Sequence, residues 1–128
     1  MNDSTKSASA RPVLHELEPK EVQELMNKHA CILLDVREPG EYEAERIPNA
    51  MLYPLSGFDA TMAPFDGKRR VILQCGSGKR SAMAAGIAHK AGIHEVTHLK
   101  GGLQAWKAAG LPVIAYDPAS GQPREQRK

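Results

Sequence analysis

The chain has 128 residues and a formal net charge of +2, with 41% hydrophobic and 25% charged residues. This length fits one domain, and the average composition excludes collagen-like, coiled-coil and wholly disordered proteins. The small net charge gives no basis for expecting nucleic acid as a partner. The longest apolar runs have four to six residues, far fewer than the roughly 20 of a membrane-spanning helix, so no membrane is expected as a partner either.

The polar N-terminal segment lacks the apolar core of a secretory signal, which predicts a cytoplasmic location. Thiols stay reduced in that compartment, so Cys31 and Cys75 are expected to be unpaired.

Short apolar strands alternate with helical stretches along the chain, and no internal repeat is evident. In chain order the pattern predicts a strand at 13–17, a helix at 19–29, a strand at 31–36, a short helix at 38–45, a strand at 50–53, a surface loop at 57–70, a strand at 71–75, a helix at 79–91, a strand at 95–99, a helix at 101–109 and an extended segment at 112–115. This alternation is typical of an α/β fold with a mainly parallel central sheet of about five strands, flanked by helices on both faces. We expect one domain over residues 12–115, between flexible tails at 1–11 and 116–128.

Two of the helical stretches predict different environments. The stretch 19–29 is amphipathic and places His29 on its apolar face, which indicates a core position for this histidine. The stretch 79–91 has almost no polar face before His89, which predicts a helix that is buried all round.

Cys75 closes a predicted strand and is followed by Gly76-Ser-Gly-Lys-Arg80 before the next helix. Sites in parallel sheets form at the carboxyl ends of the strands, so this is a position for a nucleophile. The glycines allow the loop to point its N–H groups inward, and the helix N-terminus with Lys79 and Arg80 adds positive charge. These features favour the thiolate form of Cys75. Cys31 begins a strand without such a setting and is expected in the core.

Three segments together resemble the rhodanese-like family. The loop Cys75-Gly-Ser-Gly-Lys-Arg80 is similar to its active-site motif C-x-x-G-x-R. A second segment, Leu34-Asp-Val-Arg-Glu38 with Glu43 and Ile47-Pro-Asn-Ala50, and a third, Leu99-Lys-Gly-Gly-Leu103 with Trp106, also resemble family segments. The resemblance covers about residues 13–114, with the segments in the family's order.

The resemblance implies a sulfurtransferase of the thiosulfate sulfurtransferase type. Cys75 would carry a sulfane sulfur as a persulfide, taken from thiosulfate or another persulfide donor and passed to cyanide or a thiol acceptor. The implied partners are thus a small anionic donor, a thiophilic acceptor and, as one option, a protein that accepts sulfur, with no metal or organic cofactor. The residues implied to bind the substrate or persulfide are Gly76, Ser77, Gly78, Lys79 and Arg80, with Asp35, Arg37 and Ser81 behind them.

Gly76 departs from the family pattern, because members that use thiosulfate well often have a larger or basic side chain there. The identity of the donor therefore stays open. Asp35 and Arg37 are interpreted as a structural ion pair that braces the loops rather than as groups in contact with substrate.

Two other functions remain as alternatives: a sulfur carrier or partner-binding module without turnover, and a cysteine-dependent phosphatase or arsenate reductase. The second is disfavoured because such phosphatases use C-x5-R, one residue longer than the loop here. His94 and His98 do not suggest a metal site, since four residues of a strand span about 13 Å. Trp106 is interpreted as a packing residue.

Overall fold

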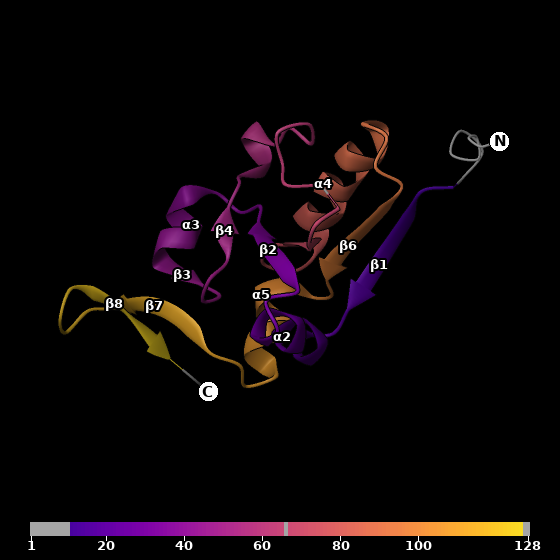
Figure 1. The fold of residues 1–128 in the computed structure, drawn as a ribbon. Coiled ribbons are helices and arrows are strands. Elements are labelled where there is room, and N and C mark those ends of the chain that lie inside the picture. The colour runs from indigo at the N-terminus through magenta and orange to yellow at the C-terminus, as the bar shows by residue number, and fades with distance from the viewer. Residues whose placement is uncertain (1–10, 66, 127–128) are drawn as a thin grey trace.

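The computed structural model describes residues 11–65 and 67–126. At its centre is a five-stranded sheet with the order β1-β6-β5-β2-β4, in which every neighbouring pair is parallel (Figure 1). Its strands are β1 (Val13–Leu17), β2 (Cys31–Asp35), β4 (Met51–Leu52), β5 (Arg70–Gln74) and β6 (Glu95–Leu99). The predicted α/β fold with a parallel sheet is therefore confirmed.

Helices cover both faces of this sheet. The helices α2 (Pro19–Asn27) and α5 (Gly102–Ala108) contact each other on one face, and α4 (Lys79–Lys90) packs along β5 and β6 on the other. The short helix α3 (Pro39–Ala44) packs instead against two strands outside the sheet. Both α2 and α3 begin with proline in the first turn and a capping box, the local signals that start a helix at these points.

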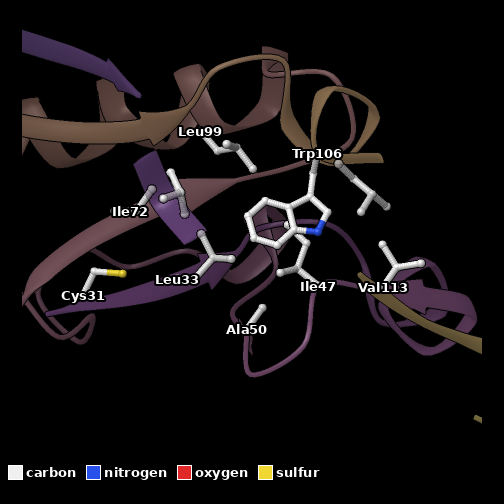
Figure 2. Close-up of a cluster of buried hydrophobic side chains, with 10 residues drawn as sticks. Cys31, Leu33, Ile47, Ala50, Ile72, Leu99, Trp106 and Val113 are labelled. Atoms are coloured by element: carbon white, nitrogen blue, oxygen red, sulfur yellow. The ribbon is translucent and has the colours of Figure 1, made fainter. Parts of the chain in front are cut away.

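Two clusters of buried side chains form the core. The cluster under α2 and α5 surrounds Trp106, which is 1% exposed and donates its Nε1–H to the Pro112 carbonyl at 2.7 Å (Figure 2). Cys31 lies in the same cluster, so both residues are packing residues as predicted. The cluster under α4 includes Leu73 and Cys75. Each large side chain buried in this way stabilises the fold by about 1.5–3 kcal/mol.

Two predictions about helix environments were wrong. Only one face of α4 is buried, at Ser81 and three alanines, whereas Met83 and Ile87 on its other face are exposed. Single apolar side chains such as Met83 and Ile87 are common on protein surfaces, so the apolar composition overstated the burial of the helix. His29 is exposed and has a φ of 55°, because the helix ends at Asn27 and the chain turns there into β2.

The C-terminal segment is paired, where the sequence predicted a flexible tail from residue 116. The strands β7 (Val113–Asp117) and β8 (Gln122–Gln126) form an antiparallel hairpin, and β7 also pairs with β3 (Glu45–Arg46), which the sequence did not predict. The hairpin extends away from the main sheet (Figure 1). Its turn is held by the Asp117 carboxylate, which accepts the Ala119 N–H at 3.0 Å and the Ser120 hydroxyl at 3.1 Å. Such a polar turn leaves little hydrophobic signal for the flanking strands.

The predicted N-terminal tail covers residues 1–11, of which 1–10 lie outside the described residues. Arg11 is exposed and belongs to no helix or strand. Among its described residues, the predicted loop at 57–70 contains the end of the 3-10 turn η1 (Leu55–Gly57) and, at Arg70, the first residue of β5. Across the described ranges, none of the helices is long and apolar enough to cross a membrane.

Candidate active site

Cys75 lies directly after β5, at the carboxyl end of the central sheet, and the loop that it begins leads into α4 at Lys79. Gly78 precedes the helix with a φ of 104°, a conformation that side chains rarely adopt. This turn curls the loop back over Cys75. The structure therefore has the cysteine loop at the carboxyl end of the central sheet, as the sequence predicted.

Backbone N–H groups converge on the sulfur of Cys75. Gly78 donates its N–H to Sγ at 3.0 Å and Ser81 donates its N–H at 3.4 Å, while the Ser81 Oγ lies 3.8 Å from Sγ. The side chain is 1% exposed, and this burial raises the pKa of the thiol. Hydrogen bonds from Ser81, Gly78 and Ser77 outweigh the effect of burial, so that the pKa of Cys75 lies below its usual value. The arrangement favours an anionic sulfur at this position.

The two cations of the loop have different surroundings. Lys79 is exposed. Arg80 is held in a two-pronged ion pair by Glu41 of α3, with distances of 2.6 and 2.9 Å between the guanidinium nitrogens and the carboxylate oxygens. The hydrogen bond from Arg80 lowers the pKa of Glu41 to about 2. Arg80, which was expected to attract an anionic donor, thus already has an anionic partner.

Two glycines at the start of α5 allow this helix to contact the loop. Leu103 donates its N–H to the Cys75 carbonyl at 2.8 Å, and Gln104 donates its N–H to the Gly76 carbonyl at 3.0 Å. A Cβ at Gly102 would lie 2.2 Å from the Cys75 carbonyl oxygen, so any side chain at this position would clash with the loop backbone. The Gly101-Gly102 pair therefore allows α5 to approach the loop closely and fix its backbone.

Asp35 and Arg37 form a buried ion pair next to the loop. The guanidinium binds both carboxylate oxygens at 2.9–3.2 Å, and it also donates to the carbonyls of Glu41 at 3.4 Å and Glu45 at 2.6 Å. Neither residue has a hydrogen bond to Cys75 among the described contacts. The pair instead joins the end of β2 to α3, the helix that carries Glu41. This geometry agrees with the interpretation of Asp35 and Arg37 as a brace.

Two residues at the site were missed by the sequence analysis. His98 on β6 is 3% exposed and lies with its Nδ1 2.7 Å from the Ser81 Oγ, while its Nε2 lies 2.9 Å from Glu16 Oε2 on β1. His98 had been considered only as a metal ligand. Within the described part of the chain, no group of three or more His, Cys, Asp and Glu side chains is placed to hold a metal ion. The available signal was a histidine between Val96 and Leu99 in a strand that is buried beyond its first residue.

The structure thus combines a parallel α/β sheet with a cysteine at a strand end, whose sulfur accepts hydrogen bonds from loop N–H groups. The family model described as "Rhodanese-like domain" matches residues 18–109, and the chain belongs to this family. The cysteine loop, the Asp35–Arg37 segment and the Gly101-Gly102 segment all lie within the match.

Relatives and solved structures agree with this assignment. The chain is 33% identical over 93 residues to "Sulfurtransferase" of Allochromatium vinosum, covering 73% of this chain and 87% of the relative. It is 42% identical over 96 residues to "Uncharacterized protein slr1261" of Synechocystis, covering 75% of this chain and about half, 54%, of that longer protein. A rhodanese-related protein from Thermoplasma volcanium superposes with a TM-score of 0.67 at 28% identity, covering 78% of this chain and 97% of that structure. These matches support the family assignment, and the relative from Allochromatium vinosum is named a sulfurtransferase.

Proposed function

We propose that the protein moves a sulfane sulfur from thiosulfate or another persulfide donor to cyanide or a thiol acceptor, through a persulfide on Cys75. The observation that carries the proposal is the pair of N–H bonds from Gly78 and Ser81 to Sγ. These donors stabilise a negative charge on sulfur in a site that excludes most water, which suits both a thiolate and a persulfide anion.

The chemistry balances in two steps. The Cys75 thiolate attacks the outer sulfur of thiosulfate, forming a new S–S bond as the old one breaks, and sulfite leaves with the electron pair. Cyanide then attacks the outer sulfur of the persulfide, giving thiocyanate and restoring the thiolate. A thiol acceptor would replace cyanide in the second step and leave as its own persulfide.

The choice of donor depends on Gly76 and Arg80. A Cβ at Gly76 would lie 3.6 Å from the Arg80 Nη2, an ordinary van der Waals distance, so a side chain at this position would lie beside the guanidinium. With glycine, Arg80 stays paired to Glu41 at the rim of the loop. An anionic donor must therefore compete with Glu41 for Arg80, which supports testing persulfide donors beside thiosulfate. We also place the reaction in the cytoplasm, where the two free cysteines would stay reduced.

Intact-mass measurement tests the proposal directly. Wild type, Cys75→Ser and Cys31→Ser proteins are incubated with thiosulfate or glutathione persulfide, and thiocyanate is followed after addition of cyanide. We expect a gain of one sulfur atom on wild type and Cys31→Ser, lost on cyanide addition with repeated formation of thiocyanate.

The other outcomes separate the alternatives. Loading without repeated turnover would indicate a sulfur carrier, and no loading from any donor would indicate a partner-binding module. Hydrolysis of an aryl phosphate that depends on Cys75 would point to a phosphatase instead.

A further inference from the structure

The sulfur of Cys75 is joined to the molecular surface by a line of polar side chains. Ser81 Oγ lies 3.8 Å from Sγ, His98 Nδ1 lies 2.7 Å from that Oγ, and Glu16 Oε2 lies 2.9 Å from His98 Nε2. Cys75, Ser81 and His98 are buried, whereas the Glu16 side chain is 51% exposed. Such a line connects a buried ionisable group to solvent without a water-filled channel.

The hydroxyl of Ser81 has one proton to donate and three neighbours that can accept it. These are the Cys75 sulfur, His98 Nδ1 and the Gly78 carbonyl at 3.2 Å. When His98 is neutral with its proton on Nε2, its Nδ1 accepts the Ser81 proton. When His98 is protonated, its Nδ1–H donates to Ser81, which frees the Ser81 hydroxyl to donate to the sulfur. The ring can thus switch the direction of the hydrogen bonds.

We propose that Ser81, His98 and Glu16 form a proton relay that takes the proton of the Cys75 thiol. The Sγ–H proton passes to the Ser81 oxygen as the Ser81 proton passes to His98 Nδ1. The products are a Cys75 thiolate and a His98 imidazolium, whose Nε2–H donates to the Glu16 carboxylate. No atom changes its oxidation state, and no other reactant is needed. The relay rests on the proposed function, for which it supplies the nucleophile.

The remaining charged groups at this end of the sheet have other partners or face solvent. Arg80 of α4 pairs with Glu41 of α3, and Asp35 pairs with Arg37 after β2. Lys100 after β6 lies 3.6 Å from Glu18 after β1, and Lys79 is exposed. The ring nitrogens of His98 contact only Ser81 and Glu16 among the described side chains. His98 is therefore the titratable group linked to Cys75 through Ser81.

The same pair of strands offers a matched control. His15 on β1 binds Glu95 on β6, with 3.0 Å between Nε2 and Oε1, but this pair has no link to the cysteine loop in the described contacts. Glu95→Gln therefore makes the same chemical change as Glu16→Gln outside the relay. His98→Asn keeps a side chain that hydrogen-bonds but cannot take up a proton.

The test is the pH profile of Cys75 alkylation by iodoacetamide, read at the Cys75 peptide by mass spectrometry. It needs no sulfur donor, so it reports on the relay even if sulfur transfer fails. Loss of the imidazolium should slow alkylation at neutral pH roughly tenfold in His98→Asn and roughly threefold in Glu16→Gln, with both profiles moved to higher pH. Glu95→Gln should match wild type.

A folded His98→Asn protein with the wild-type profile would overturn the relay. If His98→Asn does not fold, as judged by circular dichroism, Glu16→Gln decides the matter because Glu16 is half exposed on an edge strand. Equal profiles for Glu16→Gln and Glu95→Gln would then overturn the proposal. A merely structural bond would change the melting temperature without moving the pH profile.

Discussion

The two cysteines are both buried, but their thiol pKa values are shifted in opposite directions. Cys75 is 1% exposed and Cys31 is 7% exposed. Burial raises the pKa of Cys31, and the nearby Arg69 and Arg70 only partly offset it. Burial also raises the pKa of Cys75, yet the N–H bonds from Ser81 and Gly78 lower it overall. The comparison teaches that several backbone N–H groups at hydrogen-bonding distance can outweigh desolvation, which the two arginine charges near Cys31 do not.

The largest expected effect is on sulfur transfer. Cys75→Ser should lower the rate of thiocyanate formation by at least about a thousandfold, because a serine hydroxyl stays protonated where the thiol does not. Cys31→Ser should retain the rate of wild type. Steady-state assays with thiosulfate and with glutathione persulfide measure both. Equal losses in the two variants would remove the distinction between the cysteines.

The second effect is on reactivity at neutral pH. Because the pKa of Cys75 is lowered, a larger fraction of its thiol is ionised at pH 7 than in an ordinary cysteine, and this fraction falls as the pH falls through the lowered value. Cys31 has a raised pKa and stays protonated even as the pH rises through the ordinary thiol range. Alkylation at pH 7 should therefore be at least about a hundredfold faster at Cys75. Comparable rates at the two peptides would contradict the assigned pKa directions.

The third effect sharpens the role of the backbone. Gly102→Ala should displace the loop, since the new Cβ would meet the Cys75 carbonyl at 2.2 Å. We expect a loss of about 1–3 kcal/mol in unfolding free energy, measured by urea denaturation, and slower alkylation of Cys75. Gly110→Ala is the matched control, because Gly110 also has a positive φ, of 78°, but has nothing within 4 Å of an added Cβ. Similar losses in both variants would assign the cost to φ alone.

The smallest expected effect concerns the ion pair between Glu41 and Arg80 at the edge of the cysteine loop. Glu41→Gln should change stability by less than about 1 kcal/mol, because the ion pair with Arg80 is accessible to water, which screens it. Freed from its carboxylate, Arg80 should lower the KM for thiosulfate about threefold and leave kcat nearly constant, as expected for added electrostatic attraction of an anion. Glu45→Gln, which weakens the similar pair with Lys107, is the control. An unchanged KM would show that Arg80 does not meet the donor.

The sequence predicted the central sheet because its inner strands are largely buried and read as apolar runs, such as Cys31-Ile-Leu-Leu34. It also placed Cys75 at a strand end, because the Gly76-Ser-Gly78 segment that follows indicates a turn before the helix. It did not predict the pairing of β7 with β8, because the residues of β8 are polar and its register is set by the turn at Asp117. The link from Ser81 to His98 and Glu16 was missed because it depends on the β1–β6 register, which joins residues 82 positions apart. Local patterns carry no information about such a contact.

Trp106 is the single tryptophan of the chain. Its indole is sealed in the apolar core, and it lies on the same short helix whose first residues hold the Cys75 and Gly76 carbonyls. The fluorescence of Trp106 therefore reports on α5. Its emission maximum should lie at short wavelength while α5 is packed in the core and should shift to longer wavelength when the helix leaves the core. Intrinsic fluorescence, measured during denaturation, can thus follow the packing of α5 against the cysteine loop in every variant.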